Sequence, residues 1–127
     1  MSDDPIHRIE VTAHAVFVPE HSDIAADRYV FAYTVVVRNT GSVPAQLVSR
    51  HWVITDALQR VQEVRGQGVV GEQPWLAPGA QFEYVSSASI ATPVGTMHGS
   101  YQMVAADGTR FDAPIPAFSL TLPRTLH

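Results

Sequence analysis

Three glycines with the spacing G-x-G-x-x-G are the residues of this chain that most suggest a ligand. They are Gly66, Gly68 and Gly71. In dinucleotide-binding folds, such glycines end a strand and open a helix whose first amides bind a pyrophosphate. Here Pro74 and Pro78 follow and prevent a crossover helix, and residues 89–93 contain no acidic side chain for a ribose hydroxyl. We therefore predict a loop in which glycine permits positive φ or a close backbone approach. A nest of amides that binds a small anion is the alternative.

Histidine is plentiful, since the chain has six, but the spacing predicts no preformed metal site. Cysteine is absent, which excludes zinc ribbons, thiolate clusters and disulfide frameworks. His7 and His14 are an odd number of residues apart and would face opposite sides of one strand. We interpret His51 and His98 as half-buried polar residues. No metal ligand and no cofactor is expected, and a site assembled from distant His and Asp residues stays open.

Catalytic motifs have the least support in this chain. The nucleophile elbow G-x-S-x-G is absent, and the serines and threonines lie in segments typical of strands. Asp107 and Asp112 flank a hairpin signal, where aspartates commonly form turns. We therefore expect that the protein is not an enzyme and keep catalysis as a reserve hypothesis.

Arg50, His51 and Trp52 form a second candidate site. If Trp52 points into a core, Arg50 shares its face of the strand and His51 takes the opposite face. The alternative places Arg50 or His51 on an exposed sheet face beside the glycine loop, where arginine and aromatic side chains are typical binding anchors.

The elements that must position these residues are mostly strands. Alternating or β-branched apolar segments predict strands at residues 6–18, 29–39, 46–55, 82–90, 97–105, 109–111 and 118–122. Pro114 and Pro116 indicate an edge or a bend. Residues 55–64 fit a hairpin or a short helix, and we choose the hairpin. The pattern predicts an all-β chain folded as an antiparallel β-sandwich.

Composition predicts one domain over residues 1–127, with a loose N-terminus at about residues 1–5 and a short tail at about 123–127.

The net charge is −4, and all eight basic residues are dispersed arginines, which disfavours nucleic acid as a partner. The longest nearly apolar run, residues 30–37, is too short to span a membrane. The N-terminal sequence does not read as a secretion signal. A cytoplasmic protein without membrane contact is the expectation.

Several segments, in order, closely resemble the bacterial ApaG family. They are residues 29–33, 38–41, 46–56, 64–74, 76–79, 95–103 and 115–120, which read YVFAY, RNTG, QLVSRHWVITD, VRGQGVVGEQP, LAPG, GTMHGSYQM and IPAFSL. One departure is Gln59, because relatives usually have a glycine before the arginine at this point.

The resemblance implies a fibronectin type III-like (immunoglobulin-like) β-sandwich and an association with Co²⁺ and Mg²⁺ efflux or resistance. Related eukaryotic domains, in F-box and DNA-polymerase-interacting proteins, resemble protein-interaction modules. The family has no catalytic residues to transfer, and its glycine loop is a motif of unproven role. The leading hypothesis is a non-enzymatic interaction domain with an unknown protein partner; the oligomeric state stays open. A binder of a small anion or nucleotide pyrophosphate is the alternative. The candidate binding residues are Arg50, His51, Gly66, Gly68, Gly71 and Glu72.

Overall fold

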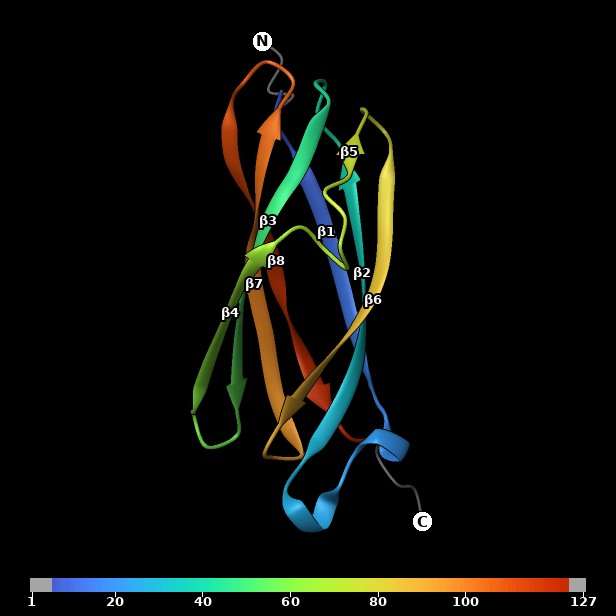
Figure 1. Ribbon diagram of the computed structural model, residues 1–127, viewed down its shortest axis with the longest axis vertical. Coiled ribbons are helices and arrows are strands. Elements are labelled where there is room, and N and C mark those ends of the chain that lie inside the picture. The colour runs from blue at the N-terminus through green and yellow to red at the C-terminus, as the bar shows by residue number, and fades with distance from the viewer. Residues whose placement is uncertain (1–5, 124–127) are drawn as a thin grey trace.

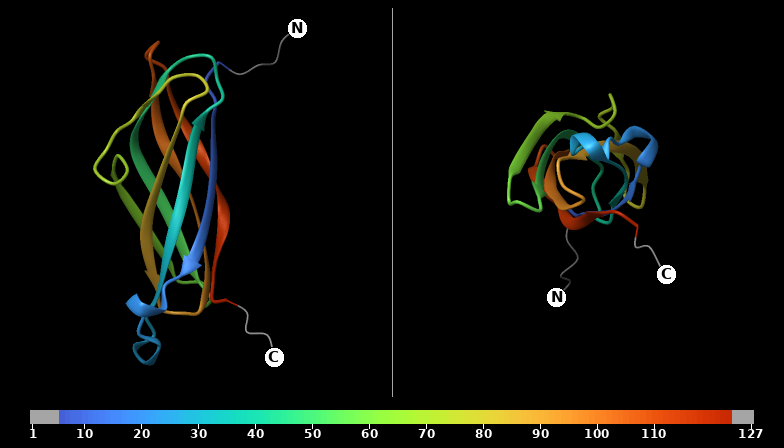
Figure 2. Two further views of the ribbon diagram at one scale, coloured as in Figure 1. Left: turned by 90° about the vertical axis from the view of Figure 1, so that its right-hand side faces the viewer. Right: turned by 90° about the horizontal axis from the view of Figure 1, so that it is seen from below.

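Two antiparallel β-sheets pack face to face along the length of the molecule in the computed structural model, which describes residues 6–123 (Figures 1 and 2). The first sheet has the order β1-β2-β6, with β1 at Ile9–Phe17, β2 at Tyr29–Asn39 and β6 at Gln81–Ile90. The second has the order β4-β3-β7-β8, with β4 at Val61–Gln67, β3 at Ala45–Asp56, β7 at Val94–Ala105 and β8 at Arg110–Thr121. A two-residue strand, β5 at Trp75–Leu76, also pairs with β3.

This arrangement confirms the predicted antiparallel β-sandwich of the fibronectin type III-like class. Two short 3-10 turns, Pro19–His21 and Ile24–Ala26, connect β1 to β2. Within residues 6–123, no helix is long and apolar enough to cross a membrane. The predicted loose N-terminus at 1–5 and all but Pro123 of the predicted tail lie outside the described residues.

The core is built from side chains that alternate along the strands. In β2 the odd-numbered residues from Tyr29 to Val37 are buried, while Val30 to Val36 on the even positions are half-buried. Both faces of β2 are partly covered, as its nearly continuous apolar sequence predicted. The odd-numbered side chains face the second sheet, and the even-numbered ones are flanked by side chains of β1 and β6, the two strands paired with β2. The largest enclosed side chain is Trp52, which meets Tyr33, Tyr101 and Phe118 nearly edge to face.

The segment that fitted a helix or a hairpin is a hairpin. Strand β3 ends at Asp56, β4 begins at Val61, and the turn between them closes through hydrogen bonds between Asp56 and Arg60. Gln59 has φ +65°, a left-handed conformation that favours glycine. A glycine would adopt this conformation without strain, which fits the expectation that relatives have a glycine at this point.

The predicted strands at residues 109–111 and 118–122 are parts of one strand, β8, which runs from Arg110 to Thr121. Its register with β7 shifts between the pairs Met97–Phe118 and Gly99–Ile115, so the bend expected at Pro114 and Pro116 corresponds to an irregularity inside this strand. The edge interpretation of the same prolines is confirmed, since β7 is the one described strand that pairs with β8. An edge strand needs hydrogen bonds on one side only, so it tolerates residues that lack an N–H group.

Candidate functional site

As predicted, the glycine motif lies in a loop and not at a helix N-terminus. It begins at the end of β4 and continues into the loop that follows. The loop is fixed to β3 because Gly68 N donates to Val48 O at 2.8 Å and Gln73 Nε2 donates to the same carbonyl at 2.9 Å. The side chain of Val69 is completely buried in the core. A Cβ atom on Gly68 would lie 2.3 Å from Glu72 O, so glycine is required there by close approach as well as by φ +62°.

A tight two-residue turn forms the tip of the loop. Val69 and Glu72 exchange two backbone hydrogen bonds, at 2.8 and 2.9 Å. The central residues Val70 and Gly71 both have positive φ, +44° and +81°, which is typical of a type I′ turn. The amides of Gly68, Val69 and Glu72 are therefore already bound to carbonyls, and a phosphate would have to displace those bonds.

Arg50 connects β3 to the glycine loop. Its Nη1 donates to Gln67 O at 3.0 Å and to Gly68 O at 2.8 Å. Arg50 pairs with Gly66 across the sheet, and a Cβ atom on Gly66 would lie 2.8 Å from the Arg50 guanidinium carbon. The first glycine of the motif therefore makes room for the guanidinium group rather than for a ligand.

Arg50 faces the inside of the sandwich together with Trp52, while His51 lies on the outer face. A β-bulge between Leu47 and Ser49 reverses the alternation of β3, so that the even-numbered residues after it point inward. Trp52 is 2% exposed, which confirms its prediction as a core residue. The candidate binding residues are therefore divided: the fold brings Arg50, Gly66, Gly68, Gly71 and Glu72 together and leaves His51 on the opposite side of the sheet.

A buried pair of tyrosines lies next to Arg50. The hydroxyl groups of Tyr84 and Tyr101 form a hydrogen bond across the two sheets. Burial raises the pKa of Tyr84 to about 12. Burial raises the pKa of Tyr101 further, against the opposing effect of the Arg50 charge. Both hydroxyls are neutral at physiological pH, so they do not compensate the charge of Arg50.

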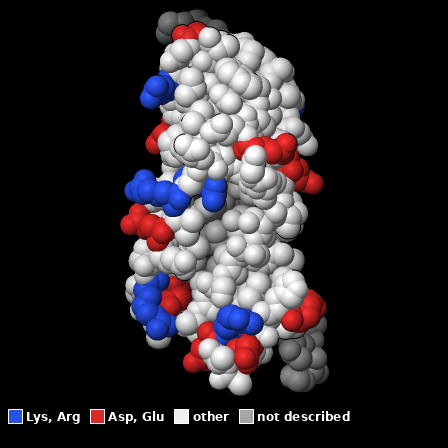
Figure 3. Space-filling model, in the orientation of Figure 1, with Lys and Arg blue, Asp and Glu red and all other residues white. Residues whose placement is uncertain are grey.

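Three adjoining hollows form a groove between β4 and β6, the intersheet groove. Their volumes are about 370, 270 and 270 Å³. Ile54, Gln62 and Ser89 line both the lower and the middle hollow, while Tyr33, Arg50 and Ser86 line both the middle and the upper one. Figure 1 shows β4 and β6, the two strands that border the groove, and in the same orientation Figure 3 shows the surface hollowed beside arginine atoms.

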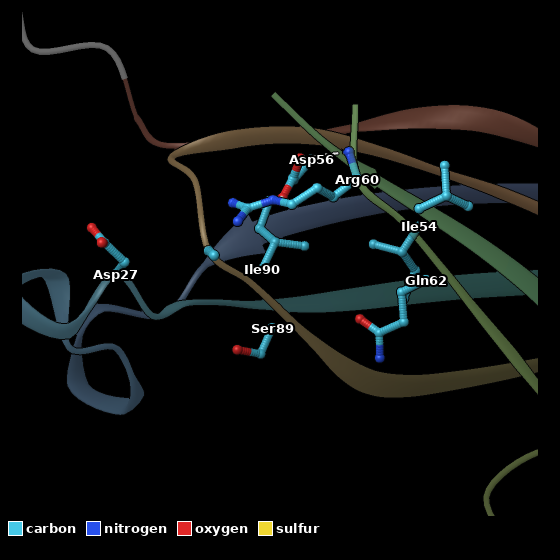
Figure 4. A pocket seen from close by; sticks show the side chains of 9 residues that line it. Asp27, Ile54, Asp56, Arg60, Gln62, Ser89 and Ile90 are labelled. Atoms are coloured by element: carbon cyan, nitrogen blue, oxygen red, sulfur yellow. Dashed lines mark hydrogen bonds and ion pairs between the residues drawn. The ribbon is translucent and has the colours of Figure 1, made fainter. Parts of the chain in front are cut away.

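Asp56 and Arg60 lie at the lower end of the intersheet groove (Figure 4). The Asp56 side chain is 7% exposed and accepts hydrogen bonds from Arg60 Nε at 2.7 Å and from the amides of Leu58 and Arg60. Burial raises the pKa of this carboxyl, but the hydrogen bonds from Arg60 and Leu58 outweigh burial and hold it below its usual value. The ion pair therefore fixes the β3–β4 hairpin rather than preparing a catalytic acid.

We expect Asp56→Asn to lower the melting temperature near neutral pH and to lose this effect in acid. Because the pKa of Asp56 is lower in the folded than in the unfolded chain, its carboxylate stabilises the fold above about pH 4, the ordinary value for aspartate. This stabilisation disappears as the pH falls through the folded pKa. Thermal unfolding between about pH 2.5 and 7 measures it, with the exposed Asp112→Asn as control. A difference between Asp56→Asn and wild type that stays constant with pH would contradict the assignment.

Two of the described histidines each pair with a single carboxylate. His51 Nε2 lies 2.7 Å from Glu63 Oε1, and His7 Nε2 lies 2.7 Å from Asp107 Oδ2. Among residues 6–123, no three His, Cys, Asp or Glu side chains gather in a way that could hold a metal ion. The pairing of His7 with Asp107 joins residues a hundred positions apart, which spacing in the sequence does not indicate.

Sequence reasoning missed the residues that shape the intersheet groove, above all Tyr33, Gln62 and Ser86. One signal was available: residues 86–89 read Ser-Ser-Ala-Ser, a run of small side chains inside a strand whose other inward positions are large. Small inward side chains leave space between two packed sheets.

Comparison with known proteins gives consistent matches over the whole chain. A family model described as the ApaG domain matches residues 19–105. A protein named ApaG from Aromatoleum aromaticum is 65% identical over 127 residues, which is 100% of both chains. Another ApaG protein, from Nitrosospira multiformis, is 62% identical over the same full length. A crystal structure named for an ApaA protein from Bordetella pertussis is 54% identical, with a TM-score of 0.91, covering 95% of this chain and 98% of that one.

Proposed function

The chain belongs to the ApaG family, and from this premise we propose that it is a non-enzymatic protein-interaction module that acts in Co²⁺ and Mg²⁺ efflux or resistance. The observation that carries the proposal is the intersheet groove, because it joins Arg50 and the glycine loop to two strand edges that are open to a partner. Arginine beside aromatic side chains is typical of binding anchors in protein interfaces. We expect the module to work in the cytoplasm.

In this proposal the protein affects cobalt tolerance through a partner and does not sequester the ion. Tight Co²⁺ binding needs several nitrogen or oxygen ligands held together. Among residues 6–123, no three His, Cys, Asp or Glu side chains gather into such a set, and His7 and His51 each pair with a single carboxylate. We therefore expect the purified, tag-free protein to bind Co²⁺ weakly, without one defined site, while a strain lacking the gene becomes more sensitive to cobalt and is restored by the wild-type gene.

Calorimetric titration with CoCl₂ and growth of the deletion strain in CoCl₂ measure the two halves of this prediction. His51→Ala and His98→Ala are the control variants, and both should leave the titration unchanged. A one-to-one isotherm with a micromolar or tighter constant that a single histidine substitution abolishes would refute the indirect role. A deletion strain with normal tolerance would remove the link to cobalt.

A further inference from the structure

At one edge of the sandwich, β4 of the second sheet has no described strand of the first sheet opposite it. At the other edge, β1 and β8 lie side by side (Figure 2). Among the described residues, no strand of the first sheet lies beyond β6 to cover β4. Gln62 and Val64 pair with Ile54 and Trp52 and so face inward, yet Gln62 is exposed and Val64 is only half-buried. One more strand beside β6 would stand opposite β4 at the usual sheet separation of about 10 Å.

The side of β6 that faces the groove is open to a further strand. In the described part of the chain, β6 pairs with β2 alone. Natural sheets protect free edges with charged residues, prolines or bulges. Strand β8 carries Pro114 and Pro116, and β4 carries Glu63 and Arg65. Residues 84–90 of β6 contain neither a charged residue nor a proline, so this edge lacks the usual protection.

The floor of the groove has hydrogen-bond donors and a positive charge without an anion. No described carboxylate forms an ion pair with Arg50, and no acidic residue lines the middle or upper hollow. The hydrogen bonds of the Arg50 guanidinium involve Nη1 alone, which leaves its other N–H groups for a ligand. Trp52 lines the middle hollow, and its buried indole N–H has no acceptor among the described residues. The free N–H groups of Arg50 fit an acceptor that carries negative charge.

We infer that the intersheet groove binds an extended segment of a partner protein that carries one inward acidic side chain. The segment adds a strand to the free side of β6 and places this carboxylate against Arg50. Main-chain hydrogen bonds to β6 supply affinity in this mode of recognition, and the side chains at alternate positions supply specificity. Because inward positions recur every second residue, an apolar side chain two residues from the acid would cover Val64. This deepens the proposed function and rests on it, since it names the class of partner for the same site.

The probe for this inference is the capped peptide KTVTETVTK, titrated into the isotopically labelled full chain and followed by amide shifts. Glutamate and the two valines share one face of the strand because they are two residues apart. The sequence reads the same in both directions, so a parallel and an antiparallel strand present the same order of side chains. We expect saturating shifts at residues 84–89, slower amide exchange in β6, and at least about tenfold weaker binding of the glutamine peptide KTVTQTVTK. The glutamine peptide tests the contact without altering the protein.

Two protein variants locate the carboxylate. Arg50→Gln should weaken binding of the glutamate peptide by at least about tenfold, because it removes the charge that meets the carboxylate. Arg65→Gln is the matched control, since Arg65 lies on the outer face of β4 with a side chain that is 71% exposed, and it should leave the affinity unchanged. Peptides N-methylated on the valines or on the threonines test strand pairing, and one of the two should lose binding.

Three results would overturn the inference. These are shifts away from β6, equal binding of the glutamate and glutamine peptides, and full binding by both N-methylated peptides. Shifts at Arg50 with sodium pyrophosphate that displace the glutamate peptide would instead assign the groove to a small anion. Self-association through β6, seen in sedimentation, would assign it to a second copy of the chain. If the peptides fail while cobalt tolerance still requires the protein and a captured partner, the proposed function stands and only the groove assignment falls.

Discussion

Trp52→Ala will lower the free energy of unfolding by about 3–5 kcal/mol, the range for removing a buried aromatic side chain. Trp52 is 2% exposed, and its ring meets Tyr33, Tyr101 and Phe118 at centroid distances of 5.3, 6.4 and 5.9 Å. Alanine would leave a cavity between the two sheets and remove these aromatic contacts. Urea unfolding followed by far-UV circular dichroism measures the loss without depending on tryptophan fluorescence.

The other tryptophan of the chain is the matched control. Trp75 is 56% exposed on β5, so Trp75→Ala should change stability by only about 0.5 kcal/mol. Equal losses for the two variants would contradict the position of Trp52 at the centre of the core. They would also weaken the description of the intersheet groove, because Trp52 forms part of its floor.

The second large effect on stability is expected at Gly68, where close packing against Glu72 leaves no room for a side chain. Gly68→Ala should cost about 2–4 kcal/mol, which combines the strain of positive φ with displacement of buried Val69. The added Cβ would lie 2.3 Å from Glu72 O, and the loop would have to move, releasing Val69 from the core. Chemical unfolding of the variant measures the change.

Gly71→Ala separates steric clash from backbone strain. Gly71 has φ +81°, but nothing lies within 4 Å of the Cβ that alanine would add. Its substitution should therefore cost only about 1–2 kcal/mol, the penalty of the left-handed conformation. If Gly68→Ala were no more destabilising than Gly71→Ala, the close approach of Glu72 to Gly68 would not hold in solution. A loss of cobalt tolerance by the stable Gly71→Ala variant would point to a direct role of the turn.

Arg50 illustrates how a correct local prediction can still miss a site. Its neighbour Trp52 identified the inward face of β3, and the alternation of a strand then placed Arg50 on the same face. The β-bulge at Leu47–Ser49 does not disturb this relation, because it lies before both residues. What alternation did not indicate is that an inward arginine would find an open groove and the Gln67 and Gly68 carbonyls instead of a closed core.

Local sequence patterns were sufficient for most of the strands and for the antiparallel sandwich, because period-two alternation and turn residues act between neighbours along the chain. They did not indicate β5 or the full length of β4 and β8, and they left residues 55–64 between a hairpin and a helix. They were also sufficient to reject the dinucleotide fingerprint, since Pro74 and Pro78 prevent a helix in any tertiary context. The resemblance to a family added the class of sandwich.

Only the tertiary structure decided which edges stay open and which side chains meet across the sheets. The intersheet groove exists because β4 pairs with β3, so that β6 has no second neighbour among the described strands. The sequences of β4 and β6 do not indicate this arrangement. The Tyr84–Tyr101 hydrogen bond and the pairing of Arg50 with Gly66 likewise join residues from different strands. Such contacts depend on sheet order and register, which arise from the packing of the whole chain and not from any local segment.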